Sequence, residues 1–562
     1  MIPIFVLPDD VLLSIFDLCI NTDVVQNIFP LAEEYAKRKI ESWQKLVHVC
    51  RCWTSLVFGS PRRLDLQLVC TTNTPARDTL DVWSALPLTI RCRGYYYSYL
   101  ITRVDNIIAV LERSDRVRQI TLENVPSQCL ELILAAMRKT FPELTSLDIS
   151  SSRYSAIVLP DSFLGGSAPH LQSLWLDCLS FPGLPKLLLS ATRLVTLRLD
   201  YIPHPGYISP EAMVTALSTL TNLRSLKLEF RSPRSYPDQA SRRPPPPTRS
   251  VLPVLTYFWF KGVTEYLEDL VALIDTPRLD DLNIILFNQI LFDTPQFIQF
   301  VSRAPRLKAL EKARILFKAD AASINLSSHT SGYRRLNVNV PCTRLDWQVS
   351  SLEQVCTSCL PPLSKLEDLY IHEAPYSHFS ADNIENTHSQ ELIHPFVAVK
   401  NLYLTEEFAP RILPVLQELV GDRTTGLLPA LRNIFLAGFE PGPTQEGIRQ
   451  FVDARRFTGH TIAFSRWDRR KRFEKSIIDN TLSLGRRLCR PLFSFARGPH
   501  DGWMDSQSFG SRSPNFRSMT TLPPRRALRY CKGDQITVMP TKMRFTCALR
   551  VNGDSALLAM AR

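Results

Sequence analysis

One short pattern recurs along most of this chain and restricts its fold more than any other feature. Six segments contain Pro-x-Leu-x-x-apolar-x-apolar or a degenerate form of it, and four more keep the same core without the proline. Each copy ends with two apolar residues at a spacing of two, which predicts a short β-strand. With two weaker copies included, the first apolar residues are Val117, Leu144, Leu171, Leu194, Leu223, Leu255, Leu279, Leu307, Tyr333, Leu366, Val399 and Leu431.

Neighbouring copies are 23 to 33 residues apart, and amphipathic helical stretches such as 129–139 and 265–275 lie between them. Strand and helix alternating at roughly 20–29 residues is typical of leucine-rich repeats. One repeat cannot bury its own apolar face, so we predict an α/β solenoid over residues 116–455, with inner parallel strands and outer helices. An ordinary doubly wound α/β domain is the alternative, because the spacing is irregular and the usual asparagine is missing.

Composition sets broad limits on the class of protein. Hydrophobic residues make up 45% and charged residues 21% of the 562 residues, which is ordinary for a soluble protein with a large core. No apolar run of about 18 residues occurs, so we expect no membrane-spanning helix. The first residues lack a basic leader, so no secretory signal is expected, and the 13 cysteines are interpreted as reduced thiols.

The net charge of +12 belongs to the end of the chain. Residues 455–562 hold 22 Lys and Arg against 7 Asp and Glu, whereas residues 1–454 hold 44 basic and 47 acidic residues. The body offers no general attraction for phosphate, so nucleic-acid binding is not expected. We predict a largely disordered basic tail over 456–562, with a nuclear-import or acidic-partner patch at 465–476 as the alternative. The Pro-rich residues 232–250 are predicted to form a solvated loop or, alternatively, a ligand for a proline-recognition domain.

The first 60 residues have a different pattern, with two predicted amphipathic helices. Leu7-Pro8 precedes the first, and acidic residues favour its N-terminus. Helices this short cannot build a stable core alone, so they need the repeat domain or a partner surface. The apolar residues at helical spacing are Val11, Leu12, Ile15 and Phe16 in the first helix and Leu46, Val49, Cys50, Trp53, Leu56 and Val57 in the second.

Leu7-Pro8-x-x-Val11-Leu12-x-x-Ile15-Phe16, followed by Val49-Cys50-Arg51-x-Trp53, resembles an F-box. Over about residues 5–455 the chain resembles the F-box family of mushroom-forming (basidiomycete) fungi with irregular leucine-rich repeats. The resemblance implies that the F-box docks on the Skp adaptor of a cullin–RING ubiquitin ligase, and that the repeats bind an unknown protein substrate. It places the adaptor contacts on Leu7, Pro8, Val11, Leu12, Ile15, Phe16, Val49, Cys50 and Trp53.

The domain plan follows from these segments. Residues 1–60 form the F-box, but its two halves are unusually far apart, with 34 residues from Ile15 to Val49. We therefore expect residues 19–42 to be an inserted helical or looped segment, and adaptor docking requires that this insert loop away from the contact face. Residues 61–115 link the F-box to the solenoid or form its first irregular repeats.

The sequence carries no phosphate-binding loop, zinc-protease motif or nucleophile elbow. One set of residues has the spacing of a zinc finger: Cys356, Cys359, His372 and His378. Leu369 is in phase with the repeat strands and Pro375 would interrupt the helix that must carry both histidines, so we favour a strand. The cluster of His48, Cys50 and Cys52 is interpreted as part of a helix packed in the core. We expect no metal, no cofactor and no enzyme activity.

The inner face is the predicted partner surface, because the residue between the last two apolar positions of each strand points there. Five of the nine such residues are aromatic, and aromatic residues with Arg or Lys are typical of binding hot spots. The alternative is that loops or the tail cover them. The nine residues are Asp148, Trp175, Arg198, Lys227, Trp259, Asn283, Tyr370, Tyr403 and Phe435.

These observations together predict a non-catalytic substrate-recognition adaptor, located in the cytoplasm, the nucleus or both. The second hypothesis is a non-degradative scaffold built on the same repeats, or a diverged paralogue. The third is an enzyme of unrecognised type.

Overall fold

The structure is a computed structural model. The chain forms two compact units, Met1–Leu484 and Gly485–Arg562. Every described residue belongs to the first unit. The described residues are 7–21, 45–60, 64, 66–73, 75–82, 86–93, 104–151, 157–233, 248–287, 294–308, 310–328, 334–358, 360, 363–374, 386–405, 407–418, 428–437, 442–457 and 461–467.

Within these residues, sixteen strands form one continuous sheet, in the order β1-β2-β3-β4-β5-β6-β7-β9-β11-β14-β13-β12-β15-β16-β17-β18. Two further strands, β8 and β10, form a separate parallel pair. The strands are β1(Leu68–Cys70), β2(Leu88–Arg93), β3(Val117–Glu123), β4(Ser146–Ser150), β5(Ser173–Asp177), β6(Thr196–Ile202), β7(Ser225–Phe230), β8(Ser250–Val251), β9(Tyr257–Gly262), β10(Ile274–Asp275), β11(Asp281–Leu286), β12(Lys312–Lys318), β13(Ala321–Ser327), β14(Arg335–Pro341), β15(Asp368–Glu373), β16(Asn401–Thr405), β17(Asn433–Ala437) and β18(Ala463–Trp467).

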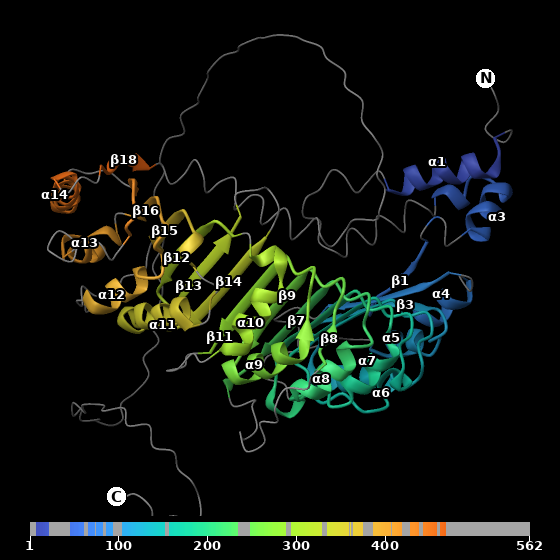
Figure 1. Cartoon of the computed structure of the whole chain (residues 1–562). Coiled ribbons are helices and arrows are strands. Elements are labelled where there is room, and N and C mark those ends of the chain that lie inside the picture. The colour runs from blue at the N-terminus through green and yellow to red at the C-terminus, as the bar shows by residue number, and fades with distance from the viewer. Residues whose placement is uncertain are drawn as a thin grey trace, which may run out of the picture. The chain divides into compact units, whose positions relative to one another are not determined.

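Helices connect most of the parallel strands, and Figure 1 shows α5 to α11 along one side of the sheet. Consecutive helices pack side by side, as α7 does against α8 and α9 against α10. The helices are α1(Asp9–Asn21), α3(Arg51–Gly59), α4(Ala76–Val82), α5(Val104–Leu111), α6(Ser127–Ala136), α7(Leu184–Ser190), α8(Pro210–Leu217), α9(Thr264–Leu273), α10(Pro295–Arg303), α11(Leu345–Ser358), α12(Asn386–Ile393), α13(Ala409–Glu418) and α14(Pro443–Phe457).

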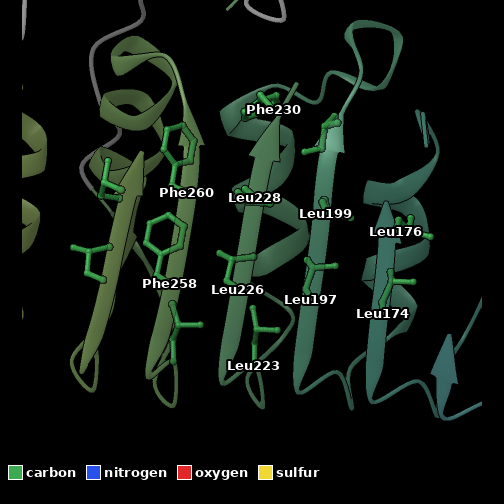
Figure 2. Packing of buried hydrophobic residues seen from close by; sticks show 14 of the residues in the cluster. Leu174, Leu176, Leu197, Leu199, Leu223, Leu226, Leu228, Phe230, Phe258 and Phe260 are labelled. Carbon is green, nitrogen blue, oxygen red and sulfur yellow. The ribbon is translucent and has the colours of Figure 1, made fainter. Parts of the chain in front are cut away.

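The repeated leucines form buried rows between the sheet and these helices (Figure 2). Adjacent strands are in register, so equivalent residues of successive repeats lie side by side. Removing each such side chain from water stabilises the fold by roughly 1.5–3 kcal/mol. The rows across β5, β6, β7 and β9 are Leu174–Leu197–Leu226–Phe258 and Leu176–Leu199–Leu228–Phe260. An α/β fold with a large, mainly parallel sheet is therefore confirmed, and it is consistent with a leucine-rich-repeat solenoid.

The sheet departs from a regular solenoid in its middle. The β12, β13 and β14 strands form an antiparallel meander, whose outer members are parallel to β15 and β11. The prediction that the degenerate repeat copy at Leu307 ends in a strand is wrong, since residues 305–307 form a 3₁₀ turn and β12 begins only at Lys312. The physical reason is that this degenerate repeat lacks its final apolar residue. The buried alternation starts later, at Ala313, Ile315 and Phe317.

The ends of the sheet also differ from the predicted boundaries. The β1 and β2 strands extend the sheet into residues 61–115. The predicted start of the tail at 456 is too early, because α14 ends at Phe457 and β18 pairs with β17. Residues 468–562 and most of the predicted loop 232–250 lie outside the described residues. Among the described helices, none is both long and apolar enough to cross a membrane.

Candidate functional site

The first helix, α1, carries apolar residues on two different faces. Leu12, Leu13 and Phe16 are buried in the main core. Val11 and Leu18 are 42% and 66% exposed, and Ile15 between them is half-buried. Because positions i, i+4 and i+7 share one face of a helix, these three residues form a second apolar stripe, which is partly to largely exposed among the described residues.

The second predicted helix is interrupted, so the prediction of one continuous helix over residues 46–57 is wrong. Residues 45–47 are helical, but Cys50 is extended (φ −161°, ψ 165°) and precedes α3 as its N-cap. The Trp53 amide donates to Cys50 Sγ at 3.5 Å, and the Thr54 hydroxyl bonds to the Val47 carbonyl at 2.7 Å. The break turns Val49 outward, so that it is 58% exposed.

The nine residues predicted to contact an adaptor therefore separate into an inner and an outer group. Leu12 and Phe16 are fully buried, which corrects their assignment as contacts, and the Phe16 ring lies 4.6 Å from that of Trp53. Leu7 and Trp53 also pack partly against the core. Pro8, Val11, Val49 and Cys50 are exposed, with Ile15 half-buried, and Leu18 is an exposed neighbour that sequence reasoning missed.

Two further N-terminal predictions can be placed. The insert predicted over 19–42 starts too early, because α1 continues to Asn21, and residues 22–44 lie outside the described part of the chain. The core interpretation of His48, Cys50 and Cys52 is wrong, since all three are exposed. The break before α3 removes them from any single helix face.

The nine predicted inner-face residues all lie on one row of the sheet. Cα register joins Asp148, Trp175, Arg198, Lys227, Trp259 and Asn283 across β4 to β11, and Tyr370, Tyr403 and Phe435 across β15 to β17. Asn337, Asn325 and Arg314 of the meander complete the row. The sequence thus predicts the position of this row, while its role in binding stays a prediction.

The row's first half is organised around the buried carboxylate of Asp200 on β6. Trp175 Nε1 donates to Asp200 Oδ2 at 3.0 Å, and Arg198 Nη2 lies 3.1 Å from the same oxygen. Lys227 Nζ lies 2.9 Å from Asp200 Oδ1. The Arg198 guanidinium also stacks 4.1 Å above the Trp175 ring. One buried carboxylate therefore fixes two cations and an indole on the inner face.

The network continues one and two strands further. Lys227 Nζ is 3.1 Å from Glu229 Oε2 and 4.2 Å from the centroid of the Trp259 ring. Lys261 Nζ lies 3.1 Å from Glu229 Oε1. The carboxylates are buried while the cations and the indoles are partly exposed. This region, which we call the charged half, comprises the inner face of β4 to β9.

Two acids of the charged half, Asp148 and Asp177, form no ion pair with another described residue. Oδ1 of each is buried without a hydrogen-bond donor among the described residues, although Asp177 has a side-chain hydrogen bond to Cys178. Burial raises the pKa of Asp148 to about 7, and the negative charge of Glu123 adds to the rise. Burial also raises the pKa of Asp177. Arg198 opposes the rise at Asp148 only in part, because its guanidinium is bound to Asp200.

The second half of the row, which we call the aromatic half, lies on β15 to β18. The Tyr370 and Tyr403 rings stack with centroids 4.1 Å apart, and Phe435 stacks on Tyr403 at 4.5 Å. The Trp467 ring of β18 meets the Tyr403 ring edge-on with centroids 5.4 Å apart, and Trp467 is the register partner of the small residue Ala437. Tyr403 is only 7% exposed. Tyr370 and Tyr403 therefore mainly bury each other, and the predicted binding face offers little of them to a partner.

A polar ladder beside the aromatic stack was not predicted. Asn401 Nδ2 donates to Asp368 Oδ1 at 2.7 Å, and Asn433 Nδ2 donates to Asn401 Oδ1 at 2.7 Å. In the middle of the sheet Arg335 makes two bonds to Asp281, at 3.1 and 2.9 Å. The signal was present as a polar residue two positions before each inner-face residue. Its hydrogen-bonded pairing, however, needs the register of the sheet.

The zinc spacing does not correspond to a finger in the described residues. His372 lies on β15, in a strand rather than a helix, and Cys356 is buried on α11. Cys359 and His378 lie outside the described residues. Among the described residues, no three His, Cys, Asp or Glu side chains are grouped as metal ligands.

Neither the protein-family models nor the curated proteins contain a match to this chain. Among solved structures, the leucine-rich repeat-containing protein LegL7 from Legionella pneumophila is similar, with 13% sequence identity. The match covers 60% of this chain and 91% of that chain, with a TM-score of 0.24. The repeat architecture is instead defined by this chain's own strand order, register and buried leucine rows.

Proposed function

We propose that this chain is a non-catalytic substrate-recognition adaptor of an SCF-type cullin–RING ubiquitin ligase. Its N-terminal helices would dock on the Skp adaptor, and its repeats would bind a protein substrate. Ubiquitin transfer would then gain from proximity rather than from any reactive group of this chain.

The exposed stripe of α1 is the observation that carries this proposal. A short helix that already buries Leu12 and Phe16 needs no second apolar face for its own stability. Val11 and Leu18 on that second face nevertheless remain exposed, and so does Val49 in the segment before α3. Exposed apolar residues gathered on one face are typical of a protein-binding surface, and the motif around them resembles an F-box.

Co-purification with the Skp adaptor tests the docking surface. We expect Val11→Asp with Leu18→Asp to abolish co-purification, because two charges would enter an apolar interface. The matched control is Leu132→Asp on α6, which changes an exposed leucine of similar exposure (58%) on another helix. Leu132→Asp should leave the complex intact. An unchanged complex with the α1 variant would reject the proposed docking face.

Substrate turnover distinguishes the adaptor from a scaffold. A protein captured through the repeats should be degraded in a manner that depends on both the cullin and the exposed α1 stripe. Capture without ligase-dependent turnover would support the non-degradative scaffold instead. Val11→Asp with Leu18→Asp should remove turnover while leaving capture by the repeats unchanged, because both residues lie outside the buried core.

A further inference from the structure

The middle of the inner face has a surface of neutral amides that neither half of the row shares. Asn283 of β11 is in register with Asn337 of β14, which is in register with Asn325 of β13. Asn339 follows Asn337 by two residues, so both side chains leave β14 on the inner face. All four are half-buried, and we call them the asparagine surface. Their strands lie side by side in the middle of the sheet (Figure 1).

Hydrogen bonds within the fold use few of these amide groups. Asn337 Nδ2 donates to Asn283 Oδ1 at 3.0 Å. Neither Asn325 nor Asn339 has a side-chain hydrogen bond among the described residues, and Oδ1 of Asn339 is buried without a partner there. In the polar ladder, by contrast, the Asn401 amide both donates and accepts. A buried polar group without a hydrogen bond costs stability, so these amides indicate a role outside the fold itself.

The spacing of Asn337 and Asn339 matches that of an extended peptide. A carboxamide carries both donors and an acceptor, as a peptide group does. Two residues along a strand span roughly 6.6 Å, and the N–H and C=O groups of alternate residues in an extended peptide recur on one side at the same distance. Because no hydrogen bond fixes the terminal torsion of Asn339, its amide can rotate to meet such a partner. A peptide main chain therefore suits this surface better than a charged group does.

Apolar side chains flank the amides on both sides. The row through Asn339 continues to Ile285 on β11 in one direction, and to Ser323 and then Leu316 in the other. Ile285 and Leu316 are half-buried on the inner face, and only the small side chain of Ser323 separates Leu316 from Asn339. When one edge of an extended peptide faces the amides, its side chains point to the left and to the right over the sheet. Ile285 and Leu316 are placed to contact them.

We propose that the asparagine surface binds the main chain of an extended segment of the partner protein. Asn337 and Asn339 each pair with the N–H and C=O of alternate residues of that segment, and Ile285 and Leu316 contact its side chains. Main-chain hydrogen bonds provide affinity in such a mode, and the flanking contacts provide selectivity. This deepens the proposed function, since it rests on a protein partner binding the repeats. It commits the partner to an extended stretch rather than to a helix.

The test uses the full chain with ¹⁵N-labelled asparagine, whose side-chain NH₂ signals are followed by NMR. The signals of Asn337 and Asn339 are assigned by their loss in Asn337→Leu and Asn339→Leu. The probe is the peptide Ac-Thr-Val-Thr-Val-Thr-amide, whose β-branched residues favour an extended chain. We expect this peptide to shift both signals in a saturable manner. Its fully N-methylated analogue, which lacks the N–H donors of all five residues, should leave both signals unchanged.

Variants of Asn339 locate the contact. Asn339→Leu should weaken binding of the peptide at least about fivefold, followed through the Asn337 signal, because two hydrogen bonds are lost. Asn339→Asp keeps the shape and the acceptor but loses the donor, so it should also weaken binding. The matched control is Asn222→Leu, which changes an exposed asparagine in the turn before β7 and should bind like the parent.

Equal responses to the peptide and its N-methylated analogue, or unchanged affinity in both Asn339 variants, would overturn the proposal. A response to maltotriose but not to the peptide would also overturn it, in favour of a carbohydrate site. The variant with Val11→Asp and Leu18→Asp should bind the peptide like the parent, because α1 is not part of the asparagine surface. Peptide binding without co-purification of the Skp adaptor would therefore reject the adaptor role alone, and the reverse result would reject the asparagine surface alone.

Discussion

The charged half and the aromatic half of the inner face have the same origin in the sequence but opposite surfaces. Both are built from the residue between the last two apolar positions of a repeat strand. In the charged half this residue is Trp175, Arg198, Lys227 or Trp259, and each remains partly exposed. In the aromatic half Tyr370 and Tyr403 stack on each other and are buried.

The difference arises from the neighbouring row. In the charged half, the next inner-face row carries Asp200 and Glu229. Their carboxylates pair with Lys227, which packs against the indole of Trp259. In the aromatic half that row includes Ala437, which leaves room for Trp467 to cover the stack. Aromatic residues on an inner face therefore indicate recognition only where their neighbours keep them exposed. By this criterion, we propose recognition for the charged half rather than for the aromatic half.

Tyr403→Ala should have the largest effect of the substitutions that compare the halves. It removes the central ring of a buried stack, and large-to-small changes of buried aromatic residues cost roughly 3–5 kcal/mol. Urea unfolding of the full chain would measure the loss. Trp259→Ala, at a half-buried position of the charged half, should cost clearly less, and Tyr403→Phe should be close to neutral. Equal losses for Tyr403→Ala and Trp259→Ala would remove the distinction between the halves.

Asp200→Ala should be the most damaging change within the charged half. It leaves Arg198 and Trp175 Nε1 without their acceptor, and Lys227 with one carboxylate instead of two. We expect a loss of about 2–3 kcal/mol, below the full cost of a broken buried pair because the cations are partly exposed. The same unfolding measurement applies.

The matched control for Asp200→Ala is Glu367→Gln, which removes an exposed partner of Lys400. Exposed pairs contribute at most about 1 kcal/mol, so this change should be nearly silent. If both substitutions cost the same, the Asp200 network is an ordinary surface feature.

The sequence predicts the repeat strands and the inner-face row well, because both depend on local spacing. Leucines at a spacing of two must face the helices, so the residue between them must face away. The exposure of that residue depends on distant partners and is not predictable in the same way. Tyr403 is covered by Trp467, 64 positions further along, in a segment that the composition assigned to the tail.

The N-terminal site was predicted only in part for a similar reason. Helical spacing places Val49 and Cys50 on one face with Trp53, but it cannot detect a break between them. The break depends on the extended Cys50 backbone and on the Thr54 hydroxyl bond to Val47. Likewise, α1 has more apolar residues than one face holds, and only packing decides that Leu12 turns inward and Leu18 outward.

Asp148→Asn should stabilise the chain at alkaline pH. Such a gain would mean that the charged Asp148 lowers stability, so its presence in the charged half would need a functional reason. The raised pKa of Asp148, about 7, means that the folded state binds this proton more tightly than the unfolded chain. The stabilisation that comes from protonating Asp148 is therefore complete at acidic pH, and it is lost as the pH rises towards 8. Glu123, Asp177, Asp200 and Arg198 are the charged groups that influence it.

The expected gain for Asp148→Asn is about 1–3 kcal/mol at pH 8, after allowance for solvent at a partly exposed group, and it should shrink as the pH falls towards 4. Thermal unfolding at both ends of this range measures it. The control is Asp115→Asn, which removes an exposed carboxylate from the turn before β3 and should show no such pH dependence. A destabilised Asp148→Asn at pH 8 would mean that Asp148 already has a cationic partner within the fold.

Asn401→Ala should have the smallest effect on the free energy of unfolding. It tests the contribution of the polar ladder in the aromatic half. It removes one bond to Asp368 and one from Asn433, so we expect a loss of about 1 kcal/mol. The equivalent position of the charged half is Thr196, for which no cross-strand side-chain bond is found among the described residues. Thr196→Ala should therefore be near neutral in the same unfolding assay. If Thr196→Ala costs as much as Asn401→Ala, strand propensity rather than the ladder accounts for both losses, and only the aromatic stack separates the two halves.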